Sequence, residues 1–334
     1  MREALFYRKQ SENNVQCQLC PHNCTIADGE NGICGVRQNL GGILFSLNGD
    51  RLIAAHVDPM EKKPLYHFFP GTETFSIAAA GCNFHCKNCQ NHTISQTTPG
   101  LLDSGETTSP QIIVTMAKRR GVSHITFTYT EPTVFYELML ETAELAKEAG
   151  LYCSVVSNGF INPEPLARLI PVISAANIDL KFASNKLYRS VAGGWPEPVV
   201  ETIKTLFDHG IVTEVTTLII PGLNDDEGEF GKLTQFLLDI SPEIPWHLSA
   251  FYPTYKMTDR NPTPPDTLVI LRQTALDKGM KYVYTGNISD AQGSTTFCPT
   301  CSKDLIQRHR LSFHSSRLEN GNCPHCTTKI YGQF

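Results

Sequence analysis

Three cysteines near the end of the first quarter of the chain have the spacing of metal ligands. Cys82, Cys86 and Cys89 follow the pattern C-x3-C-x2-C. Because a [4Fe-4S] cube normally takes four cysteines, three thiolates leave one iron free to bind a small molecule, as a catalytic metal keeps an open position. A zinc knuckle or a chance cluster of cysteines is the alternative that spacing alone leaves open. The motif predicts an iron–sulfur cluster with one reactive iron.

Eight further cysteines form two groups of four, one near each end of the chain. The N-terminal group has the spacing C-x2-C-x3-C-x9-C, and the C-terminal group consists of two C-x2-C pairs. Four thiolates suit a closed structural zinc site or an iron centre. We expect zinc, with an electron-relay cluster as the N-terminal alternative and a rubredoxin-like iron as the C-terminal one. The groups are Cys17, Cys20, Cys24 and Cys34, and Cys298, Cys301, Cys323 and Cys326.

The remaining composition indicates a globular protein of the cytoplasm. Eleven of the twelve cysteines fall into the three clusters, which favours metal binding over secreted disulfides. Cys153 stands apart in an apolar run, where a small buried core residue is expected. The net charge of −5 gives no global reason to expect nucleic acid or an anionic membrane as partner. No apolar run approaches the roughly 20 residues that span a bilayer, so no membrane association is expected.

The middle of the chain alternates short β-branched runs with longer helical patterns, which predicts repeated βα units. The expected strands are Thr74 to Ala80, Ser123 to Thr128, Leu151 to Ser157, Ala175 to Lys181, Val212 to Ile219, Trp246 to Ala250 and Tyr282 to Thr285. The expected helices are Pro110 to Arg120, Thr133 to Ala149, Pro163 to Leu169, Pro198 to His209, Glu227 to Ile240 and Pro265 to Lys278. This order predicts an α/β fold, a full or partial (β/α) barrel.

Small metal-stapled modules are expected on both sides of the barrel. We expect a β-rich N-terminal module over residues 1–70, the barrel over 71–290 and a zinc-ribbon-like module over 291–334. In the first module, Ile43 to Leu47 and Leu52 to Val57 flank Asn48-Gly49, which predicts a hairpin. In the last module, Leu305 to Phe313 alternates enough to form another. A module of about 40 residues buries too small a hydrophobic core to be stable without a bound metal ion.

Polar residues follow several predicted strands, where a barrel gathers its functional groups. The candidates are Glu131 and Asn158, which follow strands, Asp179 and Lys181, which end the fourth expected strand, and His247, which lies on the sixth. An ordinary turn is the alternative for Asn158, and a solvated charge pair is the alternative for Asp179 and Lys181. The segment Asp58 to Phe68 also carries charged and aromatic residues; it is either a face of the active site or a solvated linker.

The chain resembles a known enzyme family in many ordered segments. The cysteine triad has the spacing of radical S-adenosylmethionine (SAM) enzymes, and nearly the whole chain resembles the radical SAM component of the AmmeMemoRadiSam system, a relative of the pyruvate formate-lyase activating enzymes. The matching segments include Cys17 to Cys24, Gly32 to Arg37, Asp58 to Phe68, Gly81 to Cys89, Tyr129 to Pro132, Ile220 to Asp225 and the C-terminal cysteines. Two departures concern SAM binding: Asn88 replaces the usual aromatic residue, and Tyr129-Thr130 replaces paired glycines.

The resemblance implies a SAM-cleaving activity and assigns roles to the candidates. Cys82, Cys86 and Cys89 would hold a [4Fe-4S] cluster whose open iron binds SAM. Glu131 would hold the methionine ammonium, Asn158 and Asp179 would help orient SAM, and His247 would face substrate or SAM. The resemblance further implies a protein substrate, an electron donor such as a flavodoxin or ferredoxin, and functional pairing with AMMECR-like and MEMO-like proteins. Modification of RNA or a small molecule, and a non-catalytic iron–sulfur and zinc carrier or scaffold, are the alternatives; nucleic acid is not the expected partner.

Overall fold

The main sheet has eight strands and forms an open, partial barrel. The structure is a computed structural model that describes residues 1–97 and 99–334. The strand order is β16-β15-β14-β13-β12-β11-β9-β8, with the first seven parallel and β8 antiparallel to β9. The strands are β8 (Ala54–Pro59), β9 (Glu73–Ala78), β11 (His124–Phe127), β12 (Tyr152–Ser157), β13 (Ala175–Asp179), β14 (Val212–Ile219), β15 (Trp246–Ala250) and β16 (Val283–Gly286).

All seven predicted barrel strands are present, and their ends agree within two residues. Val212–Ile219 and Trp246–Ala250 are reproduced without change. These runs are apolar and β-branched because a parallel sheet is covered on its outer face by helices. The α/β fold with a partial barrel is therefore confirmed, and β16 and β8 form its two edges.

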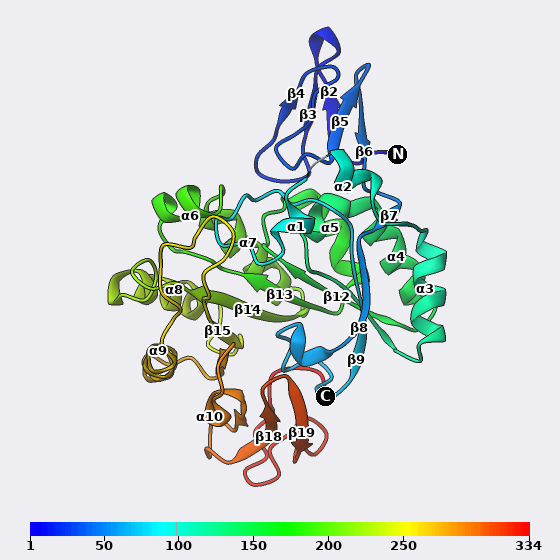
Figure 1. Cartoon of the computed structure of the whole chain (residues 1–334). Helices are drawn as coiled ribbons and strands as arrows, with labels where there is room; N and C mark the ends of the chain where they lie inside the picture. Colours follow the sequence, from blue (N-terminus) through cyan, green and yellow to red (C-terminus); the bar gives the residue numbers. More distant parts are fainter. Residues whose placement is uncertain (98) are drawn as a thin grey trace.

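Helices connect the parallel strands and surround the sheet (Figure 1). They are α1 (His92–Ser95), α2 (Pro99–Asp103), α3 (Pro110–Arg119), α4 (Tyr136–Glu148), α5 (Pro163–Leu169), α6 (Asn185–Val191), α7 (Pro196–Asp208), α8 (Glu227–Ile240), α9 (Pro265–Asp277) and α10 (Ala291–Ser294). The short 3-10 helices are η1 (Ser11–Asn13), η2 (Met60–Lys62), η3 (Pro132–Phe135) and η4 (Ile170–Val172). Side chains cap several N-termini: Ser109 accepts from Ile112, and Asp226 accepts from Gly228 and Glu229.

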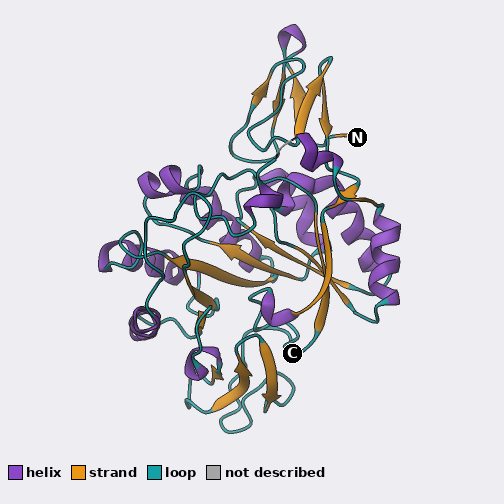
Figure 2. Cartoon of the chain, viewed as in Figure 1, coloured by secondary structure: helices purple, strands orange, loops and turns teal. Residues whose placement is uncertain are grey.

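Short strands and loops build the N-terminal module at one end of the molecule (Figure 2). Its strands are β1 (Arg2–Glu3), β2 (Tyr7–Lys9), β3 (Val15–Cys17), β4 (Thr25–Ile26), β5 (Arg37–Leu40) and β6 (Ile43–Ser46), while β7 (Arg51–Leu52) pairs with β10 (Glu106–Thr107). Strand β8, within the first 70 residues, pairs with β9 and so belongs to the main sheet.

The hairpin predicted at Asn48-Gly49 is wrong. Strand β6 forms its hairpin with β5 through Gly41 and Gly42, both with positive φ. The Asn48 side chain accepts a hydrogen bond from Ser46 and donates one of 2.6 Å to the carbonyl of Ala80. Asn48 therefore ties the module to the end of β9 instead of making a two-residue turn.

The C-terminal module lies at the opposite end of the molecule (Figure 1). It contains β17 (Thr296–Phe297), β18 (Asp304–His309) and β19 (Ser312–Ser316), which form an antiparallel sheet. The hairpin predicted around Leu305 to Phe313 is confirmed. No helix in the described part of the chain is long and apolar enough to cross a membrane.

Candidate active site

The three cysteines lie on the loop directly after β9, at the carboxyl edge of the sheet. Two donors point to the sulfur of Cys82: the backbone N–H of Phe84 at 3.3 Å and the amide of Asn158 at 3.8 Å. The sulfur of Cys89 lies 3.2 Å from the hydroxyl of Ser95. N–H donors stabilise a thiolate, the form in which cysteine binds iron. The surroundings of the triad therefore fit an iron–sulfur cluster.

Neighbouring loops hold the cysteine loop from outside. The backbone N–H groups of His85 and Lys87 donate to the carbonyls of Ala192 and Val191, at the end of α6, each at 2.9 Å. The carbonyl of Lys87 accepts a further bond of 2.9 Å from the N–H of Lys256. The three cysteines are thus positioned by main-chain contacts with segments far apart in the sequence.

Glu131 lies beneath this loop and is 2 % exposed. Its Oε1 accepts from the N–H of Thr133 at 2.9 Å and from the hydroxyls of Thr133 and Ser157, each at 2.7 Å. Its Oε2 accepts from the N–H of Asn158 at 2.8 Å. Burial raises the pKa of Glu131, although these hydrogen bonds favour the carboxylate. With four donors in place, the carboxylate fixes the turns after β11 and β12; its contact with SAM stays a prediction.

Asn158 links the turn after β12 to the cysteine loop. Its amide donates to Oδ1 of Asn83 at 2.7 Å, and its carbonyl oxygen accepts from the N–H of Phe160 at 2.9 Å. Asn83 in turn donates to the carbonyl of Phe160 at 2.9 Å. Both asparagines are buried, so Asn158 positions the residue next to Cys82.

Asp179 and Lys181 lie at the carboxyl end of β13 and pair with each other at 2.8 Å. Their side chains are 37 % and 22 % exposed, so this pair is neither buried in the core nor fully solvated. Burial would lower the pKa of Lys181, but the neighbouring Asp179 carboxylate outweighs it and holds that pKa above its usual value. The pair presents charged groups at the same edge as the cysteine loop.

His247 does not join this group. It is the second residue of β15, near the amino end of the strand, and its Nε2 lies 2.7 Å from Oε2 of Glu214. Its ring packs edge-on against Tyr66 with centroids 4.7 Å apart. His247 therefore belongs to a buried polar cluster at the other end of the partial barrel.

Most of the segment Asp58 to Phe68 is buried, although Lys62 is exposed, so the segment is not a solvated linker. Near its start, Asp58 pairs with Lys63 at 2.7 Å and accepts a hydrogen bond from the hydroxyl of Tyr129. Burial lowers the pKa of Lys63 to about 8, although the Asp58 carboxylate opposes that change. Near its end, His67 bonds to the hydroxyl of Tyr284 at 2.6 Å. The segment connects the inside of the barrel to the C-terminal module.

The four N-terminal cysteines line one enclosed cavity against the back of the cysteine loop. Asn83 and Thr133 of the barrel line the same cavity. His22, between the second and third of these cysteines, bonds to the carbonyl of Asn83 at 2.9 Å and packs against Phe160. The structure thus brings Cys17, Cys20, Cys24 and Cys34 together beside the triad.

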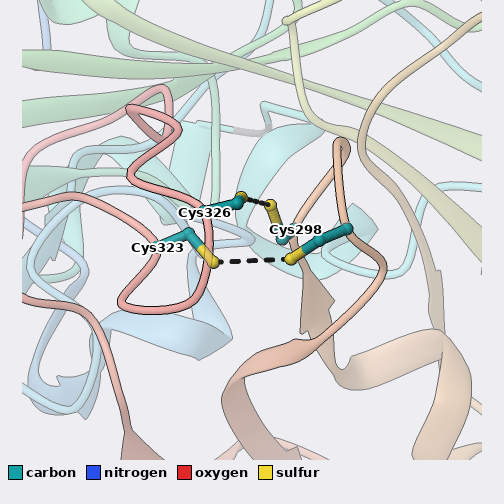
Figure 3. Close-up of side chains that lie close together, drawn as sticks. Cys298, Cys323 and Cys326 are labelled. Carbon is teal, nitrogen blue, oxygen red and sulfur yellow. Dashed lines mark hydrogen bonds between the residues drawn. The ribbon is translucent and has the colours of Figure 1, made fainter.

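The four C-terminal cysteines converge more closely. All four sulfurs lie within 4.8 Å of one another. The sulfurs of Cys298 and Cys326 are 3.5 Å apart (Figure 3), and those of Cys301 and Cys323 are 3.6 Å apart. A tetrahedral ion with metal–sulfur bonds of about 2.3 Å separates its ligands by roughly 3.8 Å. The group therefore fits a single metal ion.

Comparison with known proteins agrees with this geometry. The family model described as "Radical SAM superfamily" matches residues 76–233, which contain the triad, Glu131, Asn158 and Asp179. The uncharacterized protein MJ0808 of Methanocaldococcus jannaschii is 42% identical over 333 residues, covering 99% of each chain. Residues 76–233 of the chain form a radical SAM domain.

One further relative and one solved structure match the chain less closely. A protein of the same archaeon, assigned by name to the glycyl-radical enzyme activating enzymes, is 22% identical and covers 83% of this chain and 94% of its own. The crystal structure of a domain of pyruvate-formate lyase-activating enzyme from Bacteroides vulgatus is 17% identical with a TM-score of 0.42, covering 48% of this chain and 98% of that one.

Sequence reasoning missed several residues of the radical SAM site. Asn83, Thr133 and Ser157 each hydrogen-bond to Glu131 or Asn158, yet they belong to no spacing rule. The φ of +63° at Tyr129 is another missed feature, because a non-glycine residue in this region is uncommon. The signal for Tyr129 in the sequence was its place two residues before Glu131.

Proposed function

We propose that this protein reductively cleaves SAM at a [4Fe-4S] cluster held by Cys82, Cys86 and Cys89, and that the resulting radical abstracts hydrogen from a bound substrate. When bound, the cluster supplies one electron that breaks the bond between the sulfonium and the 5′-carbon of SAM. The single observation that carries the proposal is the cysteine loop at the carboxyl edge, with N–H donors pointing to the sulfur of Cys82.

The chain's own residues position the reacting groups in this proposal. Glu131 and Asn158 hold the turn that supports Asn83, and through it the cysteine loop. Asp179 and Lys181 are the partly exposed charged groups at the same edge, where we propose that they contact the polar parts of SAM. A protein residue that touches the cofactor contributes binding and orientation, while the cofactor carries the chemistry.

We further propose a protein substrate from which hydrogen is taken at a glycine. Support comes from the sequence resemblance to glycyl-radical activating enzymes and from the relative that carries that name. The resemblance to the AmmeMemoRadiSam component supports AMMECR-like and MEMO-like proteins as partners and a flavodoxin- or ferredoxin-type electron donor. For the C-terminal cysteines we propose zinc, which forms closed structural sites with four thiolates.

The proposal is tested by measuring SAM cleavage. The protein is purified and reconstituted without oxygen, reduced with dithionite and mixed with SAM, and 5′-deoxyadenosine and methionine are quantified by chromatography. We expect the two products in equal amounts. We expect none from the variant Cys82→Ala/Cys86→Ala/Cys89→Ala, which lacks all ligands of the SAM cluster.

Cys153→Ala is the matched control: this buried cysteine lies outside the three clusters, so we expect its loss to leave product formation unchanged. A triple variant that still releases 5′-deoxyadenosine would refute the assignment of the cluster. A wild-type protein with an intact reduced cluster that neither binds nor cleaves SAM would instead favour an electron carrier.

A further inference from the structure

We propose that Cys17, Cys20, Cys24 and Cys34 hold a second [4Fe-4S] cluster, where the sequence favours zinc. The proposal concerns metal binding in the N-terminal module and does not depend on SAM cleavage. Three features of the structure carry it: the spacing of the sulfur atoms, the cavity between them and an unpaired buried N–H group.

The spacing of the sulfurs separates two kinds of site. A tetrahedral zinc ion holds its four sulfurs about 3.8 Å apart, whereas the sulfurs bound to the corners of a four-iron cube are roughly 6 Å apart. Among the residues that the structure describes, the C-terminal cysteines are the group whose ligand atoms all lie within 4.8 Å. Neither the triad of the SAM site nor the N-terminal four meets that distance. The N-terminal group therefore lacks the compact spacing of the C-terminal group.

The space between the N-terminal sulfurs is an enclosed cavity. All four cysteines line it, together with apolar side chains that include Leu19 and Ile26. Gly32 also lines the cavity, and a Cβ on Gly32 would lie 3.8 Å from the sulfur of Cys24 and 3.2 Å from Ile26. The four cysteines thus surround one shared space instead of meeting within 4.8 Å of one another, as the C-terminal four do.

One residue that lines the cavity carries a buried donor without a partner. Arg37 is 1 % exposed and lines the cavity, and its Nη2 is paired with Glu137 at 2.8 Å. Its Nε has no hydrogen-bond partner among the described residues and is fully buried. A buried unpaired N–H costs roughly 1–3 kcal/mol unless a ligand accepts it. The sulfur atoms of a four-thiolate cluster carry net negative charge and supply such an acceptor.

The cavity adjoins the SAM site. Asn83, which lines it, follows Cys82 directly in the chain, and Thr133 on the same wall donates two hydrogen bonds to Glu131. Consecutive Cα atoms are about 3.8 Å apart, so the second cluster would lie close behind a ligand of the first. This position suits exchange of single electrons between the two clusters.

Iron content and electron paramagnetic resonance (EPR) test the proposal. The full-length protein is reconstituted anaerobically with iron and sulfide, and iron and zinc are measured per chain. We expect about eight irons in the wild type, about four in Cys82→Ala/Cys86→Ala/Cys89→Ala and about four in Cys17→Ala/Cys20→Ala. Cys153→Ala is the control and keeps about eight. In the reduced Cys82/Cys86/Cys89 variant, we expect a cluster spectrum that SAM does not alter, because all four irons already have cysteine ligands.

Two results would overturn the proposal. One is a wild-type protein with about four irons and two zinc ions. The other is a Cys82/Cys86/Cys89 variant that holds zinc but no iron. If Cys17→Ala/Cys20→Ala fails to fold, the iron content of the Cys82/Cys86/Cys89 variant still shows whether the N-terminal cysteines hold a cluster. Because that variant has no SAM site, its iron content is independent of whether the protein cleaves SAM.

Discussion

Asn158 shows how single polar side chains organise the radical SAM site. Its amide donates to Asn83 beside Cys82, and its carbonyl oxygen accepts from Phe160, so one side chain satisfies buried groups on two loops. A buried polar group that loses its hydrogen-bond partner destabilises the fold by more than the intact hydrogen bond stabilises it. The ordinary-turn alternative for this residue does not account for these contacts.

Replacing Asn158 by Ala is expected to lower the free energy of unfolding by about 1–3 kcal/mol, because Asn83 and the N–H of Phe160 lose their partner. Chemical denaturation measures the change. Asn185→Ala, which removes an exposed bond of 2.6 Å to Glu197, is the matched control and should change stability by less than about 0.5 kcal/mol. Equal effects of the two variants would contradict the role given to Asn158.

Gly159, which follows Asn158, has a φ of +68°. A Cβ at this position would lie 2.7 Å from Cγ2 of Ile178. Gly150 has a φ of +75° with no atom within 4 Å of such a Cβ. Gly150→Ala therefore tests backbone strain alone, about 1 kcal/mol, and Gly159→Ala adds a steric conflict. We expect the melting temperature of Gly159→Ala to fall further than that of Gly150→Ala; the reverse order would show that the turn is not tightly packed.

At the scale of elements, a buried ion pair joins the N-terminal module to the barrel. Arg37 of β5 and Glu137 of α4 are both nearly inaccessible and lie 2.8 Å apart. Arg2 of β1 pairs with Glu141 of the same helix at 2.6 Å, but both side chains are partly exposed. The two pairs join the same elements in different solvent environments.

Arg37→Ala is expected to lower the free energy of unfolding by about 3–5 kcal/mol, because it leaves the Glu137 charge buried without a partner. Arg2→Ala should cost about 1 kcal/mol or less, since exposed pairs contribute little. Equilibrium denaturation measures the free energy of unfolding of both variants and of the wild type. If Arg37→Ala lowered the free energy of unfolding no more than Arg2→Ala does, the buried pair would not stabilise the contact between the N-terminal module and the barrel.

The elements also show what sequence patterns can and cannot predict. The strands were found because apolar β-branched runs such as Val212 to Ile219 are required by burial on a covered sheet. The hairpin at Asn48 was misplaced because its side chain bonds to Ala80, a contact between distant segments. The hydrogen-bond donors to Glu131 and the position of His247 likewise depend on contacts between segments that are distant in the sequence. Cysteine spacing in the sequence identified all three groups. It could not give the distances between sulfur atoms, which distinguish a site for one ion from a site for a cluster.

Across the whole molecule, the two modules attach at opposite ends of the partial barrel. The N-terminal module contacts the cysteine loop, while the C-terminal module contacts the amino ends of the strands through a polar network (Figure 1). In that network His67 lies between the carbonyl of Tyr331 and the hydroxyl of Tyr284, each at 2.6 Å. Burial lowers the pKa of His67 to about 4, although Glu214 opposes that change.

This network should weaken on acidification. Between pH about 6.5 and about 4 the unfolded chain binds a proton at His67 that the folded protein does not, so the free energy of unfolding falls as pH falls. His67→Gln keeps a donor and an acceptor but does not titrate. We expect the stability difference between wild type and His67→Gln to shrink from pH 7 to pH 4 in denaturation experiments. A difference independent of pH would mean that His67 is not held neutral.

The central claim is that Cys82, Cys86 and Cys89 hold a cluster with an open iron that binds SAM. The most direct measurement is the EPR spectrum of the reduced protein before and after addition of SAM, in the variant Cys17→Ala/Cys20→Ala, so that signals from the N-terminal site do not interfere. We expect SAM to change the spectrum, because its methionine part would bind the fourth iron. A reduced cluster whose spectrum is identical with and without saturating SAM would contradict it.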